Sequence, residues 1–414
     1  MSNFPIQTAT ACQYKWAWST IFLSMGNTAS CHRCQGYPLK LHNFLDFHNL
    51  PQKQDDRQKM LAGEWPGNGC EYCRDIELAG GLSERADFIN DVEDICPPEV
   101  KAGDLTATKV TPTILEIYFS NVCNQACTYC GPQFSSQIAA ELAKYGPLEN
   151  IYELDGTYEP VKDYEERKKL LWQWMEENSQ HLKRFHVLGG EPLYQPEFEE
   201  CLQFFEGKVH PKLDWCIFTN LKHPTHKLKE KLDRMEKLVN ENKIGAISFI
   251  ISQDCWGPEA EYARYGTDLK NWEENFNLIL EREWALMFVH STLTCITLPS
   301  AYELADKLKE WRKVKNIGHG WNIIVHPSFF APEIFGHHMT EYFDKLIESV
   351  GDNNGHAYEY LEGFKKKVAA KGVDVKEIMR LRNVLDKLDE RRGLDWRAIY
   401  PWMDKIMKDT IIHG

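Results

Sequence analysis

The chain has 414 residues, of which 43% are hydrophobic and 26% charged, a balance typical of a soluble globular protein. Its formal net charge of -13 provides no bulk positive field for phosphate backbones, so we expect no nucleic-acid partner. No apolar run approaches the roughly 18 residues that cross a bilayer, and the N-terminus MSNFPIQTATACQYKW lacks the pattern of a signal peptide. We therefore expect a cytoplasmic protein without a membrane partner.

Residues 1–105 show few periodic elements and are rich in cysteine, glycine and proline. Five of the thirteen cysteines of the chain lie in the first 75 residues, and three more lie close together further on. Tight cysteine spacing in a reducing compartment indicates metal or iron–sulfur ligation rather than disulfides. We predict a small N-terminal module, residues 1–105, whose fold depends on bound metal.

From about residue 110 the pattern alternates regularly between strands and helices. Such alternation predicts parallel strands joined by helical crossovers, and six units are too few to close an eight-fold barrel. We predict an α/β fold with an open, partial (β/α)6 barrel over residues 106–330 and a helical region over 331–414. The expected strands are 114–119, 185–188, 213–218, 246–251, 287–296 and 321–325, and the expected helices are 133–144, 164–182, 196–206, 226–242, 258–282 and 300–311.

Four short motifs follow the first four predicted strands directly. They are CNQACTYC at 123–130, GGEP at 189–192, Thr219-Asn220, and Ser252-Gln253-Asp254. The loops after the C-terminal ends of parallel strands share one face of such a barrel, and that face carries the chemistry. The sequence therefore predicts one site at this face.

The C-x3-C-x2-C spacing of Cys123, Cys127 and Cys130, with Tyr129 before the last cysteine, resembles the signature of the radical S-adenosylmethionine (SAM) enzymes. GGEP resembles a second signature of the same superfamily. The resemblance implies that the three cysteines bind a [4Fe-4S] cluster and that its fourth iron chelates the amino and carboxylate groups of SAM. A partial zinc site is the alternative.

The resemblance also implies SAM-binding roles for further positions. Two glycines would let the backbone approach the methionine amino group, a serine at a strand end would reach the ribose, and an arginine would pair with the SAM carboxylate. The serine could instead cap the strand end, and the arginine could be a solvated charge. The positions are Tyr129, Gly189, Gly190, Glu191, Thr219, Asn220, Ser252 and Arg264.

The N-terminal cysteines form the pattern C-x13-G-x4-C followed by C-x2-C, which resembles the SPASM and twitch auxiliary-cluster modules. The resemblance implies one auxiliary [4Fe-4S] cluster with Cys12, Cys31, Cys70 and Cys73 as ligands and Cys34 spare. The alternative is a structural zinc held by the two C-x2-C pairs that begin at Cys31 and Cys70.

The expected function is reductive cleavage of SAM to a 5′-deoxyadenosyl radical that abstracts hydrogen from a peptide or protein, as in ribosomal-peptide maturation. An oxidoreductase or mutase acting on a small metabolite is the alternative. Cys255 could donate a hydrogen atom to a substrate radical, although a lone cysteine is more often a small buried hydrophobe. Expected partners are a separate leader-recognition protein and an electron donor such as flavodoxin or ferredoxin.

Overall fold

The computed structural model describes residues 4–34, 36–88, 95–148, 158–351 and 355–413, and within them nine strands form one sheet. The strand order is β3-β2-β1-β4-β5-β6-β7-β8-β9. β1 and β4 to β9 are parallel to one another, whereas the pairs β1–β2 and β2–β3 are antiparallel. The strands are β1 (Trp18–Phe22), β2 (Asn27–Ala29), β3 (Tyr37–Pro38), β4 (Ile114–Tyr118), β5 (Arg184–Leu188), β6 (His210–Thr219), β7 (Ile244–Ser252), β8 (Ala285–Leu293) and β9 (Ile317–Ile323).

The helices fall into three groups along the chain. The N-terminal group contains α1 (Gln13–Ala17), α2 (Pro51–Leu61), α3 (Glu71–Leu78), α4 (Glu84–Phe88) and α5 (Pro98–Lys101). The crossover group contains α6 (Ser136–Tyr145), α7 (Tyr164–Asn178), α8 (Glu197–Glu206), α9 (Thr225–Asn240), α10 (Pro258–Ala263), α11 (Leu269–Leu280) and α12 (Ala301–Trp311). The C-terminal group contains α13 (Thr340–Val350), α14 (Gly355–Ala369), α15 (Val375–Arg392), α16 (Trp396–Ile399) and α17 (Pro401–His413).

The predicted alternation of strands and helices is confirmed, as are the mostly parallel sheet and the helical C-terminal region. The strands β4 to β9 correspond one by one to the six predicted strands. The sequence did not predict β1, which pairs in parallel with β4 and carries the sheet into the cysteine-rich segment.

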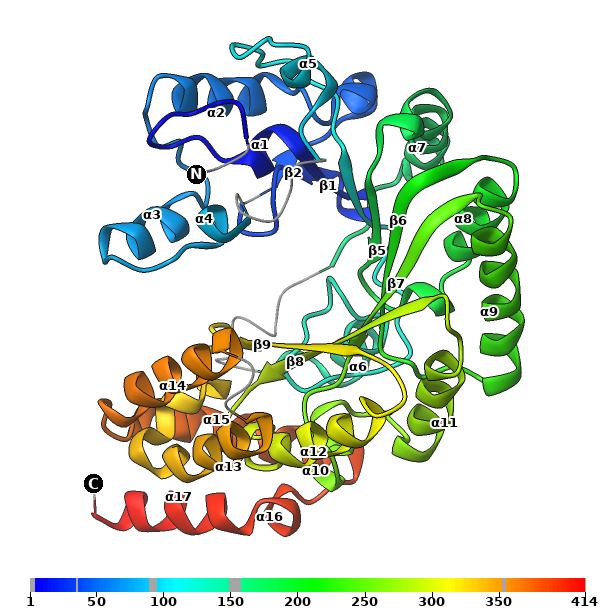
Figure 1. Cartoon of the computed structure of the whole chain (residues 1–414). Coiled ribbons are helices and arrows are strands. Elements are labelled where there is room, and N and C mark those ends of the chain that lie inside the picture. Colours follow the sequence, from blue (N-terminus) through cyan, green and yellow to red (C-terminus); the bar gives the residue numbers. More distant parts are fainter. Residues whose placement is uncertain (1–3, 35, 89–94, 149–157, 352–354, 414) are drawn as a thin grey trace.

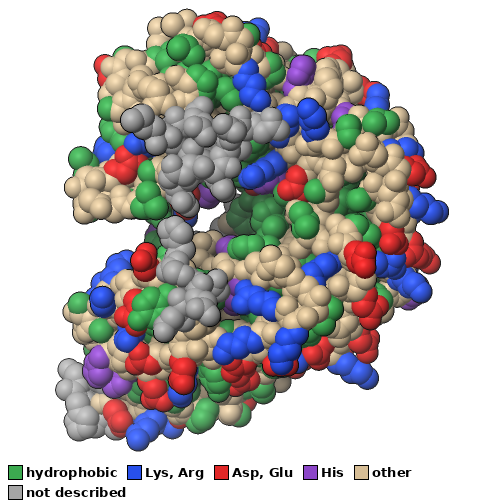
Figure 2. All heavy atoms as spheres, in the orientation of Figure 1, with side chains coloured by type: hydrophobic (Ala, Val, Ile, Leu, Met, Phe, Trp, Pro, Cys, Tyr) green, Lys and Arg blue, Asp and Glu red, His purple; other side chains and the backbone are tan. Residues whose placement is uncertain are grey.

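The sheet is curved, with helices α7, α8, α9 and α11 on its outer face (Figure 1). The apolar sides of these helices and of the strands form the largest hydrophobic cluster, in which residues such as Trp215, Phe249 and Phe276 have no exposed surface. A second cluster joins the end of β8 to the C-terminal helices. The N-terminal elements and the C-terminal helices lie on either side of the inner face, and Figure 2 shows a hollow between them.

None of the helices in the described part of the chain is long and apolar enough to cross a membrane.

Candidate active site

The C-terminal ends of β4, β5, β6 and β7 surround a cavity of about 300 Å³. All three cysteines of the CNQACTYC segment line it, as do all eight positions expected to bind SAM. The structure therefore shows the predicted convergence of four separate motifs on one face of the barrel. The residues of both sets that line the cavity are Cys123, Cys127, Tyr129, Cys130, Gly189, Gly190, Glu191, Thr219, Asn220, Ser252 and Arg264.

The cysteine loop is fixed on both sides by hydrogen bonds. The backbone N–H groups of Ala126 and Thr128 donate to the carbonyls of Tyr265 and Ala263 at 2.9 and 2.8 Å, so the loop pairs with the segment on either side of Arg264. The side chain of Ser135, which caps the N-terminus of α6, donates to the carbonyl of Gln125 at 2.7 Å. The loop geometry is thus set by structure outside the loop.

The thiols of this loop are held in surroundings that oppose their ionisation. Burial raises the pKa of Cys123 to about 12 and also raises the pKa values of Cys127 and Cys130. The thiolates also repel one another, which acts in the same direction for Cys123 and Cys130. A cationic iron cluster would reverse this balance, because metal ligation replaces the thiol protons. Three neighbouring thiols that face one cavity fit such a group in number and in donor type.

The GGEP segment makes a turn that requires its glycines. Gly189 and Gly190 have φ values of +82° and +60°, a region that residues with a Cβ rarely adopt. A Cβ at Gly189 would collide with the ring of Tyr118, and one at Gly190 would collide with the carbonyl of Val122. The turn therefore brings bare backbone to the wall of the cavity.

Gln195 holds this turn against the cysteine loop, a role that the sequence did not reveal. Its side-chain amide donates to the carbonyls of Gly189, Val122 and Ser120 at 2.7, 3.0 and 3.2 Å. The N–H of Glu191 also donates to the Val122 carbonyl, at 2.9 Å. A glutamine four residues after GGE carries no distinctive signal by itself, so only the fold identifies it.

The carboxylate of Glu191 is engaged inside the protein. It accepts hydrogen bonds from the hydroxyl of Thr219 at 2.8 Å and from the N–H of Asn220 at 2.6 Å. Burial raises the pKa of Glu191 to about 7 despite these bonds. Glu191, Thr219 and Asn220 therefore position the loops after β5 and β6, and the backbone of the GGE turn is what faces the ligand space.

Arg264 forms a buried, bidentate ion pair with Asp254. Its Nε and Nη2 atoms donate to the two carboxylate oxygens, each at 2.9 Å, and the Asp254 side chain is 1% exposed. The hydroxyl of Tyr129 donates to the same carboxylate, as does the N–H of Thr292 at 2.8 Å. The carboxylate raises the pKa of Arg264, so the guanidinium stays charged at the cavity wall. Sequence reasoning quoted Asp254 but gave it no role.

The two other candidates after β7 differ in their surroundings. Ser252 is half-buried and lines the cavity, as expected. Cys255 has no exposed surface, belongs to the second hydrophobic cluster and does not line the cavity. Burial raises the pKa of its thiol. This placement agrees with a small buried hydrophobe and gives the predicted hydrogen-atom donor no support, because the thiol packs among side chains such as Ala260 and Tyr262 instead of facing the mouth of the barrel.

The five N-terminal cysteines also come together. Cys12, Cys31, Cys34, Cys70 and Cys73 line one cavity of about 30 Å³, beside the buried ammonium of Lys15. That volume holds roughly one water molecule. In the described part of the chain, no three or more His, Cys, Asp or Glu side chains already surround a common point as ligands of one ion would.

Cys34 occupies the centre of this group. Its sulfur lies 3.4 Å from that of Cys31, and the thiols of Cys31 and Cys70 both lower its pKa by hydrogen bonding. The Lys15 ammonium acts in the same direction and forms an ion pair with Asp56 at 2.6 Å. The structure thus places Cys34 among the expected ligands, whereas the sequence pattern set it aside as spare.

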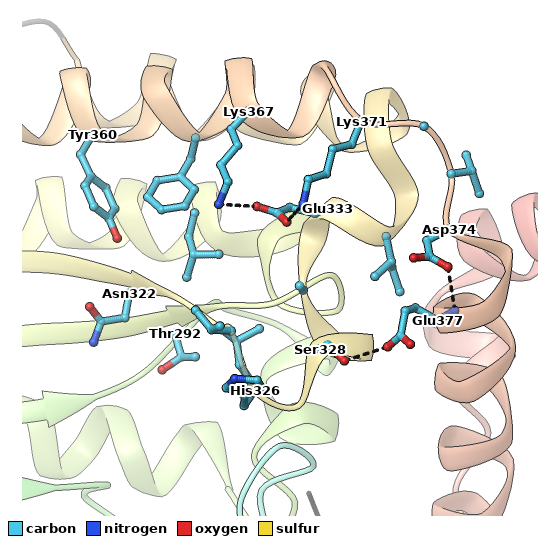
Figure 3. Close-up of a pocket in the computed structure, with 18 of the residues that line it drawn as sticks. Thr292, Asn322, His326, Ser328, Glu333, Tyr360, Lys367, Lys371, Asp374 and Glu377 are labelled. Carbon is cyan, nitrogen blue, oxygen red and sulfur yellow. Dashed lines mark hydrogen bonds and ion pairs between the residues drawn. The ribbon is translucent and has the colours of Figure 1, made fainter. Parts of the chain in front are cut away.

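A third and larger cavity, of about 1180 Å³, lies beside the first. Figure 3 shows its lining from the ends of β8 and β9 and from helices α14 and α15. Arg33, Tyr72 and Ile76 of the cysteine-rich segment complete it. Thr292 joins the two cavities, since it lines the large one and its N–H contacts Asp254, which holds Arg264 in the small one.

Comparison with models of protein families agrees with this geometry. Residues 117–282 match the family model described as the radical SAM superfamily. A solved structure described as TYW1 with a lysine-pyruvate adduct bound is 15% identical over 59% of this chain and 72% of that chain, with a TM-score of 0.29. No curated protein matches the sequence.

Proposed function

Because residues 117–282 place this chain in the radical SAM superfamily, we propose that it is a radical SAM enzyme that abstracts hydrogen from a peptide or protein substrate. The convergence of three thiols and eight predicted SAM-binding positions on one cavity supports this proposal. Cys123, Cys127 and Cys130 would hold a [4Fe-4S] cluster. Such a cluster, once reduced by an external electron donor, would supply the electron for reductive cleavage of bound SAM into methionine and a 5′-deoxyadenosyl radical.

The side chains around the cavity would bind and orient SAM. Arg264 presents a fixed guanidinium that suits the SAM carboxylate, and Asp254 holds its orientation from behind. The GGE turn would present backbone to the methionine amino group, and Ser252, which lines the same cavity, would reach the ribose. The apolar and aromatic residues Tyr118, Phe134 and Phe218 exclude water from the reacting atoms.

The size of the neighbouring cavity supports a peptide or protein substrate. Sites for small molecules are usually about 300–1,000 Å³, and the large cavity exceeds this range at about 1180 Å³. Its extent between the cysteine-rich segment and α14 suits an extended chain better than a compact metabolite. We propose that a flavodoxin or ferredoxin donates the electron and that a separate protein recognises any leader sequence.

We further propose that four of the five cysteines that line the small N-terminal cavity hold an auxiliary iron–sulfur cluster. The thiols converge on one cavity, and the buried Lys15 ammonium would offset the negative charge of thiolate ligands. Zinc is the alternative outcome. Metal analysis distinguishes them, because the auxiliary cluster adds about four irons and no zinc.

The direct test is production of 5′-deoxyadenosine. The protein is reconstituted without oxygen, reduced with dithionite and supplied with SAM, and the product is measured by liquid chromatography. Cys127→Ala should abolish the product, whereas Cys201→Ala, a substitution on the buried side of α8, should retain it. Equal production by Cys127→Ala and the wild type would refute the proposed role of the cysteine loop.

A further inference from the structure

A further cavity lies on the inner face of the sheet, beside the cavity lined by Cys123, Cys127 and Cys130, which we call the SAM cavity. It has a volume of about 390 Å³ and is formed by side chains of β5 to β9, and we call it the inner-face cavity. Phe218 lines both cavities, so they meet at this side chain. A group held in the inner-face cavity would therefore lie next to bound SAM.

The thiol of Cys216 points into the inner-face cavity. Successive side chains of a strand point to opposite faces, and the neighbours Trp215 and Ile217 pack beneath the outer-face helices of Figure 1. Cys216 therefore points to the inner face, where it lines the cavity and is 7% exposed. By contrast, the other four isolated cysteines all lie within hydrophobic clusters, namely Cys96, Cys201, Cys255 and Cys295.

The surroundings of the Cys216 thiol keep its hydrogen in place. The thiol hydrogen-bonds Asp214 and Ser248, and the Ser248 hydroxyl donates to the same carboxylate at 2.8 Å. Burial, together with the Asp214 carboxylate, raises the pKa of the Cys216 thiol. A nucleophilic or metal-binding cysteine acts as a thiolate, whereas a hydrogen-atom donor needs the intact S–H group. These contacts therefore favour hydrogen-atom donation.

Two polar side chains of β5 line the same cavity without partners. His186 is 7% exposed, and its imidazole has no hydrogen-bond partner among the described residues, although Glu116 lies 3.6 Å from its Nδ1. The half-buried guanidinium of Arg184 likewise forms no ion pair with any residue that the structure describes. Buried polar groups without partners are uncommon and call for an explanation, such as a missing ligand. Two such donors suit the two carbonyls that flank the α-carbon of a peptide residue.

Cys216 and the SAM-binding loops approach the inner-face cavity from different levels of the sheet. Cys216 pairs in register with His186 and Ser248, and Phe218 follows it by two residues along β6. Thr219, at the end of β6, lines the SAM cavity. At 3.3 Å per residue, the thiol level lies roughly 10 Å from that end. This interval admits one substrate residue, with SAM on one side of its α-carbon and the thiol on the other.

The inner face of β8 joins this place to the large cavity. Phe288 lines the inner-face cavity and Thr292 lines the large one, and both project from the same face because they are four residues apart. On β9, a Cβ at Gly318 or Gly320 would collide with the ring of Phe288, so the ring lies against these two glycines. A peptide in the large cavity could therefore place one residue over the inner face.

We propose that Cys216 is a catalytic residue that returns a hydrogen atom to a peptide residue held in the inner-face cavity and thereby inverts its α-carbon. This inference rests on the proposed function and names the change made to the substrate. The Cα–H bond breaks, and its hydrogen joins the 5′-deoxyadenosyl carbon on the SAM side. The S–H bond of Cys216 then breaks, and its hydrogen forms a new Cα–H bond on the opposite face. One electron from a ferredoxin- or flavodoxin-type donor and one proton from solvent restore the thiol.

The test is run in D2O, because thiol hydrogens exchange with solvent and Cα hydrogens of peptides do not. A pool of short synthetic peptides of L-amino acids is incubated with the full-length reconstituted protein, SAM and dithionite. The peptides are then hydrolysed in ordinary water and analysed by chiral chromatography and mass spectrometry. We expect the wild type to form D-residues that carry a single deuterium at Cα, together with 5′-deoxyadenosine that carries none.

Two variants separate the chemistry of the thiol from its packing. Cys216→Ser keeps a hydroxyl that can hydrogen-bond Asp214, but an O–H bond is too strong to give a hydrogen atom to a carbon radical. Cys201→Ala removes an unrelated thiol on the buried side of α8. We expect the number of deuterated D-residues per 5′-deoxyadenosine to fall at least tenfold in Cys216→Ser and less than twofold in Cys201→Ala. Partial misfolding lowers both products together and leaves this ratio interpretable.

Three results would overturn the proposal: D-residues without deuterium, 5′-deoxyadenosine without D-residues, or equal ratios in Cys216→Ser and Cys201→Ala. Each of them leaves the proposed cleavage of SAM standing, because 5′-deoxyadenosine is still formed. Absence of 5′-deoxyadenosine from the wild-type reaction would instead refute the proposed function itself. The two failures are therefore distinguishable in one experiment.

Discussion

Asp254→Asn is expected to destabilise the protein strongly, although the substitution hardly changes the size of the side chain. The carboxylate is 1% exposed and receives two bonds of 2.9 Å from Arg264, one of 2.8 Å from the N–H of Thr292, and one from the hydroxyl of Tyr129. The amide of asparagine cannot balance the guanidinium, which would remain charged and buried.

The magnitude follows from the cost of an uncompensated buried charge. Removing one partner of a buried ion pair costs roughly 3–5 kcal/mol. Arg264→Met should cost a similar amount, because it leaves the carboxylate unpaired. The double variant carries neither charge, so its loss should be about 2–3 kcal/mol smaller than the sum of the single losses. Asp306→Asn breaks a surface pair with Lys309 and should change stability by about 1 kcal/mol or less.

The measurement is guanidinium chloride unfolding of the metal-free protein under reducing conditions. Tryptophan fluorescence and far-ultraviolet circular dichroism should give coincident transitions, which justifies comparing midpoints between variants. If the double variant loses as much unfolding free energy as the two single variants together, Arg264 and Asp254 are not coupled. That result would refute our account of how Arg264 is held.

Three further results are expected. Gly190→Ala should weaken SAM binding at least tenfold in equilibrium dialysis, because its Cβ would collide with the Val122 carbonyl. The control Gly363→Ala in α14 places its Cβ in open space and should stabilise the helix by about 0.5–1 kcal/mol. The raised pKa of Glu191 means that the folded state binds a proton more tightly than the unfolded state, so the stability contributed by this group is lost as pH rises from about 4.5 to about 7. Glu191→Gln should therefore remove this pH dependence from a plot of unfolding midpoint against pH. An unchanged plot would contradict the raised pKa of Glu191. Cys34→Ala should lower the iron content by about four per chain, because its thiol lies among those of the expected cluster ligands. Unchanged iron content would show that Cys34 is not a ligand.

The sheet from β4 onward could be predicted because its strands are rich in β-branched and aromatic residues and alternate with long helices. The sequence did not predict β1 because Trp18–Phe22 lies in a segment rich in cysteine, glycine and proline and follows no clear helix–strand alternation. Its hydrophobicity does not alternate, since both faces are covered in the sheet. The run Thr20-Ile21-Phe22 was the one available signal.

The cavity-lining positions could be predicted because each follows a strand that the sequence identifies. The residues that hold these positions in place could not be predicted. Asp254, Gln195 and the segment around Tyr265 contact residues far apart from them in sequence, namely Thr292, Val122 and Ala126, and polar residues of these types occur in many loops. The involvement of Cys34 likewise depends on where its backbone turns, which spacing does not reveal.

In the parallel pairing of β1 with β4, Trp18 lies beside Ile114, and the ribosome adds Ile114 to the chain 96 residues after Trp18. At roughly 5–20 residues per second, β1 waits about 5–20 seconds for its partner during synthesis. Meanwhile β2 can pair with one edge of β1, whereas the edge that β4 will occupy stays without its strand. Nascent chains should therefore be most vulnerable to proteases and to mispairing in this interval.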